Sequence, residues 1–389
     1  MKIAFIRQRY NPFGGAERFV ERATAELAAQ GATITIIARD WAGATHQRTT
    51  HAPSLVRCDP FHIGRWWRDA SFARAVCALV GRDQYDLVQS HERLSCCDIY
   101  RAGDGVHRQW LDHRARQQSA PARWFTALNP YHRYVLAAEA RLFASTQLRA
   151  VVCNSRMVQQ DITRHFPAVA KKLHVIYNGL DLETFHPRLR TQLRAAERAR
   201  LGIAADQFVY VFVGAGFERK GVNRLLEAFA RQPGGTARLL VVGNDRALAA
   251  TRRRAQASGI GARVHFAGGQ PDVRPYYAAA DCFVLPTLYD PMPNAAIEAL
   301  ACGLPVITSL QSGAAELITE GSNGFVGDAL DPDGLADRMT RVRALDPLVS
   351  AIAARSAVAE LSIERMTERL LALYRGLLAP AGRMHATRG

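Results

Sequence analysis

The chain has 389 residues, of which 48% are hydrophobic and 22% are charged, and its net charge is +15. This length and composition predict two or three domains with substantial cores, and the absence of any run of 18 apolar residues excludes a membrane-spanning helix. The positive charge, most of it arginine, suits nucleic acid, anionic lipid or a phosphorylated substrate and does not choose between them.

Short apolar runs alternate with helical segments through the first half of the chain. A strand is expected at 2–6, followed by a loop, a helix at 16–30 and a second strand at 32–38. Further buried strands are expected at 85–89, 99–102, 150–154 and 173–177. This βαβ alternation predicts a doubly wound parallel sheet.

The crossing to a second domain is expected at 178–187, which reads NGLDLETFHP and is followed by an arginine-rich stretch. A second alternation then begins. Its strands are expected at 208–213, 238–242, 263–266, 282–285, 306–308 and 324–326, and its helices at 222–231, 246–258, 273–280 and 334–344, with a helical stretch to 378. The sequence therefore predicts an α/β protein in which two Rossmann-like domains, 1–187 and 188–365, face each other across a cleft. A helix and tail at 366–389 are able to return to the first domain.

Two further patterns bear on where the protein works. The N-terminal apolar strand is too short for a secretory signal peptide. The seven cysteines show neither metal-ligand spacing nor a disulfide framework. A reducing cytoplasm is therefore expected.

The stretch 281–309, DCFVLPTLYDPMPNAAIEALACGLPVITS, predicts a strand, a loop, a helix and a second strand. Asn294 is expected to be the N-cap of the helix. The loop and helix N-terminus then lie at the carboxyl edge of the sheet, where free amides and the helix dipole attract a phosphate. Asp290 and Glu298 flank that spot, and each carboxylate accepts hydrogen bonds from adjacent hydroxyls. The pattern suits a nucleotide sugar, although a solvated helix Glu and a turn-forming Asp have the same spacing.

The segment 214–221, GAGFERKG, follows a strand and opens a helix. Small residues such as Gly216 let the backbone approach a ligand, while Arg219 and Lys220 place two positive charges at a helix N-terminus. This predicts a site for a diphosphate that develops negative charge; a solvated Arg-Lys turn is the alternative. Gly14 and Gly15 occupy the corresponding strand-to-helix turn of the first domain and are expected to face the cleft.

These motifs and the two-domain layout resemble glycosyltransferase family 4 and its GT-B architecture along essentially the entire chain. The 281–309 stretch resembles the family's E-x7-E motif, with Asp290 in place of the first Glu. The resemblance implies that Glu298 holds the nucleotide ribose, that Asp290 contacts the transferred sugar, and that Arg219 and Lys220 stabilise the leaving diphosphate. It also implies that a Gly-Gly loop packs against the diphosphate. The donor-binding residues expected in addition are Gly14, Gly15, Gly216, Gln270, Met292, Pro293, Asn294 and Ala295.

Asp104, in IYRAGDGVH, ends a first-domain strand amid glycines. Many members of the family have a His near here, but the lipopolysaccharide-core glucosyltransferases, which add the first glucose to inner-core heptose, have an acid in a similar A-x-D setting. An acid at this place would orient the acceptor hydroxyl and take up its proton, or it would stabilise the cationic sugar. His107 is the competing candidate, and a capping Asp is the structural alternative. Gln270 lies in the loop AGGQPDV, which resembles the family's base-binding loop; uridine is the expected base, with guanosine as the alternative.

Residues 105–143 interleave aromatic rings with arginines. This mixture suits the headgroup layer of an anionic membrane surface, where each basic side chain adds about 1 kcal/mol. The core glucosyltransferases carry a membrane-contacting segment at this place. Nucleic acid would need the same residue types, and a plain aromatic core helix is a further alternative. Trp66 and Trp67, which lie between two arginines, extend the same surface.

Other classes of protein fit the sequence less well. A nicotinamide-dependent dehydrogenase would use Asp40, which ends the second strand, but the G-x-G-x-x-G fingerprint is absent. No nucleic-acid-binding module is recognised, so nucleic acid is not expected as a partner. There is no D-x-D metal motif suited to a donor diphosphate, so no metal and no cofactor are expected, and the Arg-Lys pair would replace a metal's charge.

The sequence therefore predicts a retaining, metal-independent hexosyltransferase, peripheral on the cytoplasmic face of the inner membrane. The donor is expected to be UDP-glucose, and the acceptor a lipopolysaccharide inner-core heptose or a similar lipid-linked glycan. A family 4 transferase using GDP-mannose or a UDP-N-acetylhexosamine in capsule or O-antigen synthesis is one alternative. A non-catalytic nucleotide-sugar-binding protein is the other.

Overall fold

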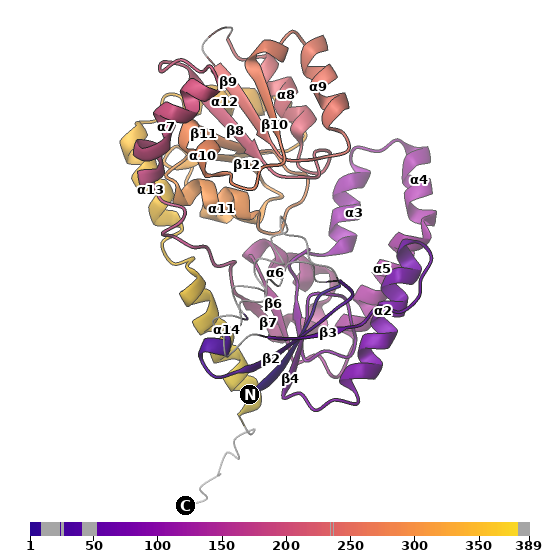
Figure 1. Ribbon diagram of the computed structural model, residues 1–389. Helices are drawn as coiled ribbons and strands as arrows, with labels where there is room; N and C mark the ends of the chain where they lie inside the picture. Colours follow the sequence, from indigo (N-terminus) through magenta and orange to yellow (C-terminus); the bar gives the residue numbers. More distant parts are fainter. Residues whose placement is uncertain (9–23, 25–26, 41–52, 234, 236, 380–389) are drawn as a thin grey trace, which may run out of the picture.

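The computed structural model describes residues 1–8, 24, 27–40, 53–233, 235 and 237–379 (Figure 1). Gly14 and Gly15 lie outside these residues. The described chain forms two domains, each built on a parallel sheet with helices packed against it. The predicted α/β class with two Rossmann-like domains is confirmed.

The first domain has a seven-stranded sheet in the order β3-β2-β1-β4-β5-β6-β7, with every described strand pair parallel. Its strands are β1 (Lys2–Ile6), β2 (Thr33–Ala38), β3 (Ser54–Arg57), β4 (Leu87–Ser90), β5 (Ile99–Arg101), β6 (Ala150–Cys153) and β7 (Leu173–Val175). Its helices are α2 (Gly64–Val80), α3 (His107–Ala115), α4 (Ala120–Leu128), α5 (Pro130–Phe143), α6 (Arg156–His165) and η1 (Pro167–Lys172). The edge strand β3 has no counterpart among the predicted strands.

The second domain has a six-stranded sheet in the order β10-β9-β8-β11-β12-β13. Its strands are β8 (Phe208–Val213), β9 (Ala237–Val242), β10 (Val264–Gly268), β11 (Cys282–Leu285), β12 (Val306–Ser309) and β13 (Gly324–Gly327). Its helices are α7 (Arg188–Arg200), α8 (Val222–Ala230), α9 (Leu248–Ala257), η2 (Gly261–Arg263), α10 (Arg274–Ala279), α11 (Asn294–Ala301), η3 (Gly313–Leu317), α12 (Pro332–Val342) and α13 (Pro347–Ala357). The central strands are apolar throughout, because helices cover both faces of a parallel sheet.

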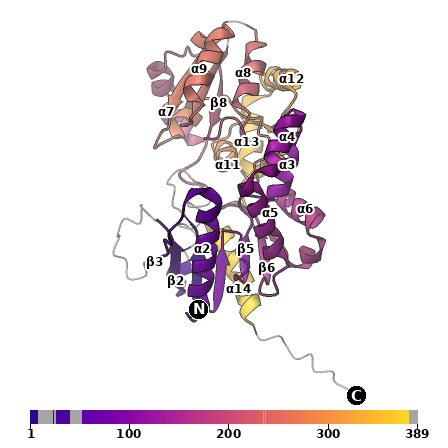
Figure 2. The ribbon, with the colours of Figure 1, turned by 90° about the vertical axis from the view of Figure 1, so that its right-hand side faces the viewer.

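The last helix, α14 (Ile363–Leu378), lies against the first domain, although it follows the second in the sequence (Figures 1 and 2). Met366, Leu370 and Tyr374 are buried in the same apolar cluster as β1 and β2. The Tyr374 hydroxyl also donates to the side-chain oxygen of Gln89 at 2.6 Å. The core of the first domain is therefore built from both ends of the chain.

The chain crosses between the domains twice, and the two crossings are bonded to each other. The Leu180 N–H donates to the Leu361 carbonyl at 2.8 Å, and Leu180 forms a parallel bridge with Ser362. Gly179 allows the close approach, because a Cβ there would lie 2.7 Å from the Cα of Ile363. The two crossings thus run side by side at one end of the cleft.

The arginine-rich stretch after residue 187 forms α7, a helix of the second domain. On α7, the arginines 190, 194 and 198 all pair with Asp281, at 3.3, 2.6 and 2.6 Å. Arg194 also donates to the last carbonyls of α10, those of residues 278–280. Cations at a helix C-terminus satisfy its free carbonyls, so this positive charge holds α7 on α10.

The structure contains a disulfide that the cysteine spacing does not predict. Cys77, near the end of α2, is bonded to Cys96, which follows β4. The two residues are 19 positions apart, and their Cα atoms lie 5.6 Å from each other. The spacing of the cysteines gives no sign of this pairing because the fold, not the local sequence, brings α2 over that loop. The cysteine pattern therefore no longer supports a reducing compartment.

Candidate active site

The two central strands of the second sheet bring two loops together. β8 and β11 are parallel neighbours at the point where the strand order reverses. The loop after β8 leads into α8, and the loop after β11 leads into α11. The Leu288 N–H donates to the Arg219 carbonyl at 2.8 Å and joins the loops. Ligands of doubly wound sheets bind at such a switch point.

Gly221 makes this close approach possible. Its φ of +76° lies in the left-handed region, and a Cβ there would lie 2.0 Å from the carbonyl oxygen of Pro286. Any other residue would be strained in its backbone and would also collide with the second loop. The glycine that ends the GAGFERKG segment is thus required by packing.

Two cations and one carboxylate meet where these loops touch. The Asp290 Oδ2 lies 3.2 Å from the Lys220 Nζ and 3.3 Å from the Arg219 Nη1. Burial raises the pKa of Asp290, but Lys220 and Arg219 outweigh it and hold the pKa below its ordinary value. The carboxylate is therefore ionised at neutral pH, and the group of three carries a net positive charge that suits a bound anion.

Glu298 lies on α11, one turn beyond this group, and is 3% exposed. The Tyr277 hydroxyl donates to its Oε2 at 3.0 Å and lies 3.2 Å from the Ala295 carbonyl. The solvated-residue alternative is wrong for Glu298, because α11 turns this side chain inward. A buried carboxylate oriented by a tyrosine can accept hydrogen bonds from two neighbouring hydroxyls.

Asn294 does not cap α11 as predicted. The cap position is Pro293, which makes no side-chain cap bond, and Asn294 is the first residue of the helix. Its Oδ1 instead accepts a hydrogen bond from the Asn178 Nδ2 at 2.7 Å. The Asn178 Oδ1 in turn accepts from the guanidinium of Arg101, at the end of β5. Asn294 therefore links the helix start to the first domain.

A cleft of about 1,800 Å³ separates the two domains and contains these groups. It exceeds the 300–1,000 Å³ typical of a site for one small molecule, so it has room for two substrates. The predicted residues that line it are Asp104, Arg219, Lys220, Gln270, Asp290, Met292, Pro293, Asn294, Ala295 and Glu298.

Asp104 and His107 line the cleft on the side of the first domain. The Asp104 side chain is 57% exposed and lies 3.9 Å from a guanidinium nitrogen of Arg7. The His107 Nε2 lies 3.1 Å from the His132 Nδ1. Burial, with help from the Arg93 charge, lowers the pKa of His107 to about 3. The imidazole is therefore neutral and tied to its neighbour, whereas the Asp104 carboxylate is open to a ligand.

Tyr289, directly before Asp290, joins the two domains. Its hydroxyl donates to the Asp161 Oδ2 on α6 at 3.0 Å and accepts from the Val106 N–H at 3.0 Å. Its backbone carbonyl accepts from Arg219 at 2.7 Å. Gly105 provides the space, because a Cβ there would lie 2.4 Å from the Tyr289 hydroxyl oxygen. The first-domain loop at Gly105 and Val106 and the cation group are thus in direct contact through one side chain.

Two family models match the chain and divide it where the structure does. The model described as Glycosyltransferase Family 4 matches residues 13–184, and the model described as Glycosyl transferases group 1 matches residues 194–356. The chain belongs to glycosyltransferase family 4. The predicted family is confirmed, and the chain is a glycosyltransferase.

The relatives of this transferase include enzymes of lipopolysaccharide synthesis. It is 35% identical to the lipopolysaccharide core biosynthesis glycosyltransferase LpsE of Rhizobium meliloti, in an alignment covering 46% of this chain and about half (53%) of that protein. It is 25% identical to the lipopolysaccharide glucosyltransferase WaaG of Escherichia coli, over 84% of this chain and 85% of that protein. It is also 28% identical to a D-inositol 3-phosphate glycosyltransferase of Saccharomonospora viridis, over 94% and 90%.

Solved structures agree on the fold. The crystal structure of WaaG matches the transferase with a TM-score of 0.80 and 23% identity, over 96% of this chain and 100% of that chain. Anabaena HepE in complex with UDP and glucose matches with a TM-score of 0.69 and 21% identity, over 97% and 100%. The predicted GT-B fold is therefore confirmed.

Among the predicted site residues that the structure describes, Gly216 is the one that does not line the cleft of the transferase. Its N–H donates to the Asp245 Oδ2 at 2.8 Å, and the Phe217 N–H donates to the same oxygen at 3.0 Å. Gln270 does line the cleft, and its Nε2 donates to the Ala267 carbonyl at 2.6 Å. The Gly216 amide is thus already paired within the protein.

Four residues of the site were missed from the sequence: Asn178, Asp245, Tyr277 and Tyr289. Asp245 follows β9 in GNDRA, at the same sheet edge, and that position is the signal that was available. The others have no local signal, because their partners are far away in the sequence. Tyr289 and Asp161, for example, are 128 positions apart.

The aromatic and arginine-rich segment forms three helices with different environments. No residue of α4 is buried, and Trp124, Phe125 and Leu128 are 61%, 67% and 47% exposed. The core-helix alternative is therefore wrong for α4, whereas α5 buries one face against the domain. The end of α3 reaches the second domain, because Arg116 pairs with Asp328 at 3.2 Å (Figures 1 and 2).

Metal sites and membrane spans are both absent from the described residues. These residues contain no group of three or more His, Cys, Asp or Glu side chains arranged to hold a metal ion. None of their helices combines the length and the apolar character needed to cross a bilayer.

Proposed function

We propose that this transferase moves glucose from UDP-glucose to a sugar of a lipid-linked glycan, with retention of the anomeric configuration. The observation that carries the proposal is the group formed by Arg219, Lys220 and Asp290 at the switch point of the second sheet. A net cation beside a buried sugar-binding acid suits a diphosphate that leaves from a sugar. The names of the relatives supply the sugar and the base, since WaaG is a glucosyltransferase and HepE binds UDP and glucose.

The donor lies along the second domain in this proposal. Glu298, oriented by Tyr277, holds the two ribose hydroxyls. Arg219 and Lys220 turn from Asp290 to the diphosphate and stabilise the charge that develops as the sugar leaves. Asp290 is thereby released to accept hydrogen bonds from the hydroxyls of the transferred sugar. The two cations supply the positive charge for the leaving group.

The acceptor approaches from the first domain. Its hydroxyl attacks the anomeric carbon from the face that the diphosphate leaves, and a diphosphate oxygen takes the proton. Asp104 orients that hydroxyl, because its carboxylate is exposed to the cleft. His107 is neutral and bonded to His132, so it contributes shape and not charge.

The acceptor is delivered at a membrane surface, on the cytoplasmic face of the inner membrane. The exposed Trp124, Phe125 and Leu128 of α4 enter the headgroup layer, and exposed arginines such as Arg123 and Arg133 meet anionic lipid. Neutralising both arginines should reduce sedimentation with vesicles containing phosphatidylglycerol. The matched control neutralises Arg82 and Arg253, two arginines that are also exposed and lie outside the 105–143 segment. Equal losses in both variants would contradict a specific role for α4.

The donor and the reaction are tested with a panel of UDP- and GDP-sugars. Nucleotide release is measured with and without a lipid-linked acceptor, and the product is examined by NMR for its anomeric configuration. UDP-glucose should give the highest rate and an α-linked product. A β-linked product would overturn retention. Tight UDP-sugar binding with no transfer to any acceptor would make the protein a binder and not an enzyme.

A further inference from the structure

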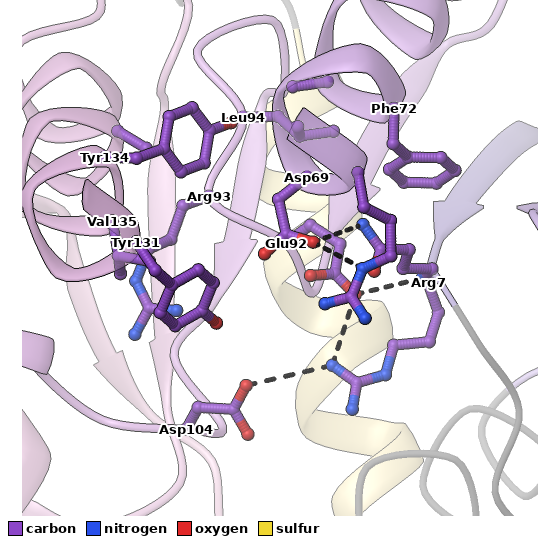
Figure 3. A pocket seen from close by; sticks show the side chains of 14 residues that line it. Arg7, Asp69, Phe72, Glu92, Arg93, Leu94, Asp104, Tyr131, Tyr134 and Val135 are labelled. Atoms are coloured by element: carbon purple, nitrogen blue, oxygen red, sulfur yellow. Dashed lines mark hydrogen bonds and ion pairs between the residues drawn. The ribbon is translucent and has the colours of Figure 1, made fainter. Parts of the chain in front are cut away.

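A smaller hollow of about 240 Å³ opens into the first domain (Figure 3). Arg93, Asp104 and Tyr131 line both this chamber and the interdomain cleft, so the two spaces adjoin. Asp104 thus lies where the chamber meets the reaction site. The chamber is smaller than the 300–1,000 Å³ of sites for drug-sized ligands, which matches one sugar ring and not a nucleotide sugar.

The opposite walls of the chamber differ in chemistry. Figure 3 shows Tyr131, Tyr134 and Val135 of α5 on one side, facing Asp69 and Glu92 on the other. Aromatic and aliphatic side chains suit the C–H faces of a sugar, and carboxylates accept hydrogen bonds from pairs of hydroxyls. The lining therefore has both kinds of contact that a pyranose ring needs.

The guanidinium groups in this lining are all paired with carboxylates. Arg7 lies 3.4 Å from Glu92, and Arg68 lies 2.8 Å from Asp69. The remaining guanidinium, Arg93, donates to the buried Glu139 at 3.1 Å. The chamber thus has no excess of positive charge among the described residues, in contrast to the group around Lys220.

Resting on the transfer reaction proposed above, we infer that this chamber binds one uncharged sugar ring of the acceptor and rejects a ring that carries a phosphate or carboxylate. An anion here would have to break an existing ion pair or lie beside Asp69, Glu92 and Asp104, which costs free energy in a partly desolvated site. The accepting hydroxyl is then presented to Asp104 at the mouth of the chamber. An uncharged acceptor sugar differs from the D-inositol 3-phosphate in the name of the S. viridis relative, because that compound is an anion.

The test compares methyl α-mannoside with mannose 6-phosphate as probes. Binding of each to the UDP-loaded full chain is measured by saturation-transfer NMR and titration. The neutral probe should bind at least tenfold more tightly. Tighter or equal binding of the phosphorylated probe would overturn the inference, and so would the failure of both probes to bind.

Two variants locate the binding in the chamber. Asp69→Asn keeps the side-chain shape but leaves Arg68 without its carboxylate, so the preference for the neutral probe should fall by about tenfold. Tyr134→Leu should weaken both probes by a similar factor, because it removes an aromatic face without changing charge. Asp83→Asn, an exposed acid beyond the end of α2, is the matched control and should change neither value.

UDP affinity and hydrolysis of UDP-glucose without acceptor separate this inference from the proposed function. Both should be the same in Asp69→Asn, Tyr134→Leu and the unmodified chain. If UDP binds, but Asp69→Asn leaves the preference for the neutral probe unchanged and Tyr134→Leu leaves the affinity for both probes unchanged, the inference fails while the transferase proposal stands. If the unmodified chain does not bind UDP, the proposed donor fails first.

Discussion

Replacing Lys220 by Ala tests the group on which the proposed chemistry depends. Its ammonium lies 3.2 Å from the Asp290 carboxylate. At an effective dielectric constant of 20, two unit charges at that distance attract by roughly 5 kcal/mol, and desolvation cancels a large part of this. Losing one group that stabilises developing charge typically costs about 2.7–4 kcal/mol in the transition state. Turnover should therefore fall by about 10²- to 10³-fold.

Lys220→Ala also leaves a buried carboxylate with one cation fewer, so a fall in activity alone does not assign the role. A double-mutant cycle with Asp290→Asn separates the two effects. If Lys220 stabilises the leaving diphosphate, the Ala substitution still lowers turnover by about 10²-fold or more in a chain that already carries Asp290→Asn. If Lys220 only neutralises Asp290, the substitution has no further effect in that chain.

Initial rates of UDP release at saturating UDP-glucose provide the measurement for all four proteins of the cycle. Lys171→Ala, an exposed lysine of the first domain, is the control for loss of one positive charge. Near-normal turnover of Lys220→Ala, or no effect of it when combined with Asp290→Asn, would refute the role in leaving-group stabilisation.

The remaining predictions concern the domain contact, the nucleotide and pH. Tyr289→Phe removes the hydrogen bond to the buried Asp161 carboxylate, which then retains Arg164 at 3.7 Å, and it leaves the Val106 amide without its acceptor. Denaturant unfolding should therefore show a loss of about 1–3 kcal/mol; unchanged stability would contradict this. Glu298→Ala should weaken UDP binding at least tenfold by calorimetry, and intact affinity would remove its ribose role. Burial holds the pKa values of His91 and His107 below their ordinary values. As the pH falls below about 6.5, these two histidines take up protons in the unfolded chain but not in the folded chain, which favours unfolding. The melting temperature should therefore be lower at pH 5 than at pH 7.5, and an equal or higher value at pH 5 would contradict this assignment.

The central strands of the second domain could be predicted closely because they are buried on both faces, unlike the edge strand β10. The bounds of β8 and β11 match the predicted 208–213 and 282–285, since an apolar run between glycine, proline or polar residues is the signature of such a strand. The predicted ends of the helices were less accurate. The start of α11 moved by one residue because Asn294 is engaged by Asn178, a contact between domains that local sequence does not encode.

Some residues of the candidate site could likewise be predicted from the sequence, and others could not. Residues that follow a central strand, such as Asp104, Lys220 and Asp290, could be placed at the cleft because topology puts every carboxyl end at one edge. Residues that act through distant partners could not. Tyr289 and the Cys77–Cys96 pair depend on how whole elements pack, and neither has a spacing that marks it in advance.

The paired crossings make the second domain an insertion within the first. Its apolar cluster runs from Leu180 to Leu361 without a contribution from either end of the chain, and these two residues are bonded to each other. The second domain is thus one continuous polypeptide whose ends already meet, so it has the topology of a unit that can be excised whole. The first domain has no such independence: deleting α14 would expose the sheet face that Met366 and Leu370 cover.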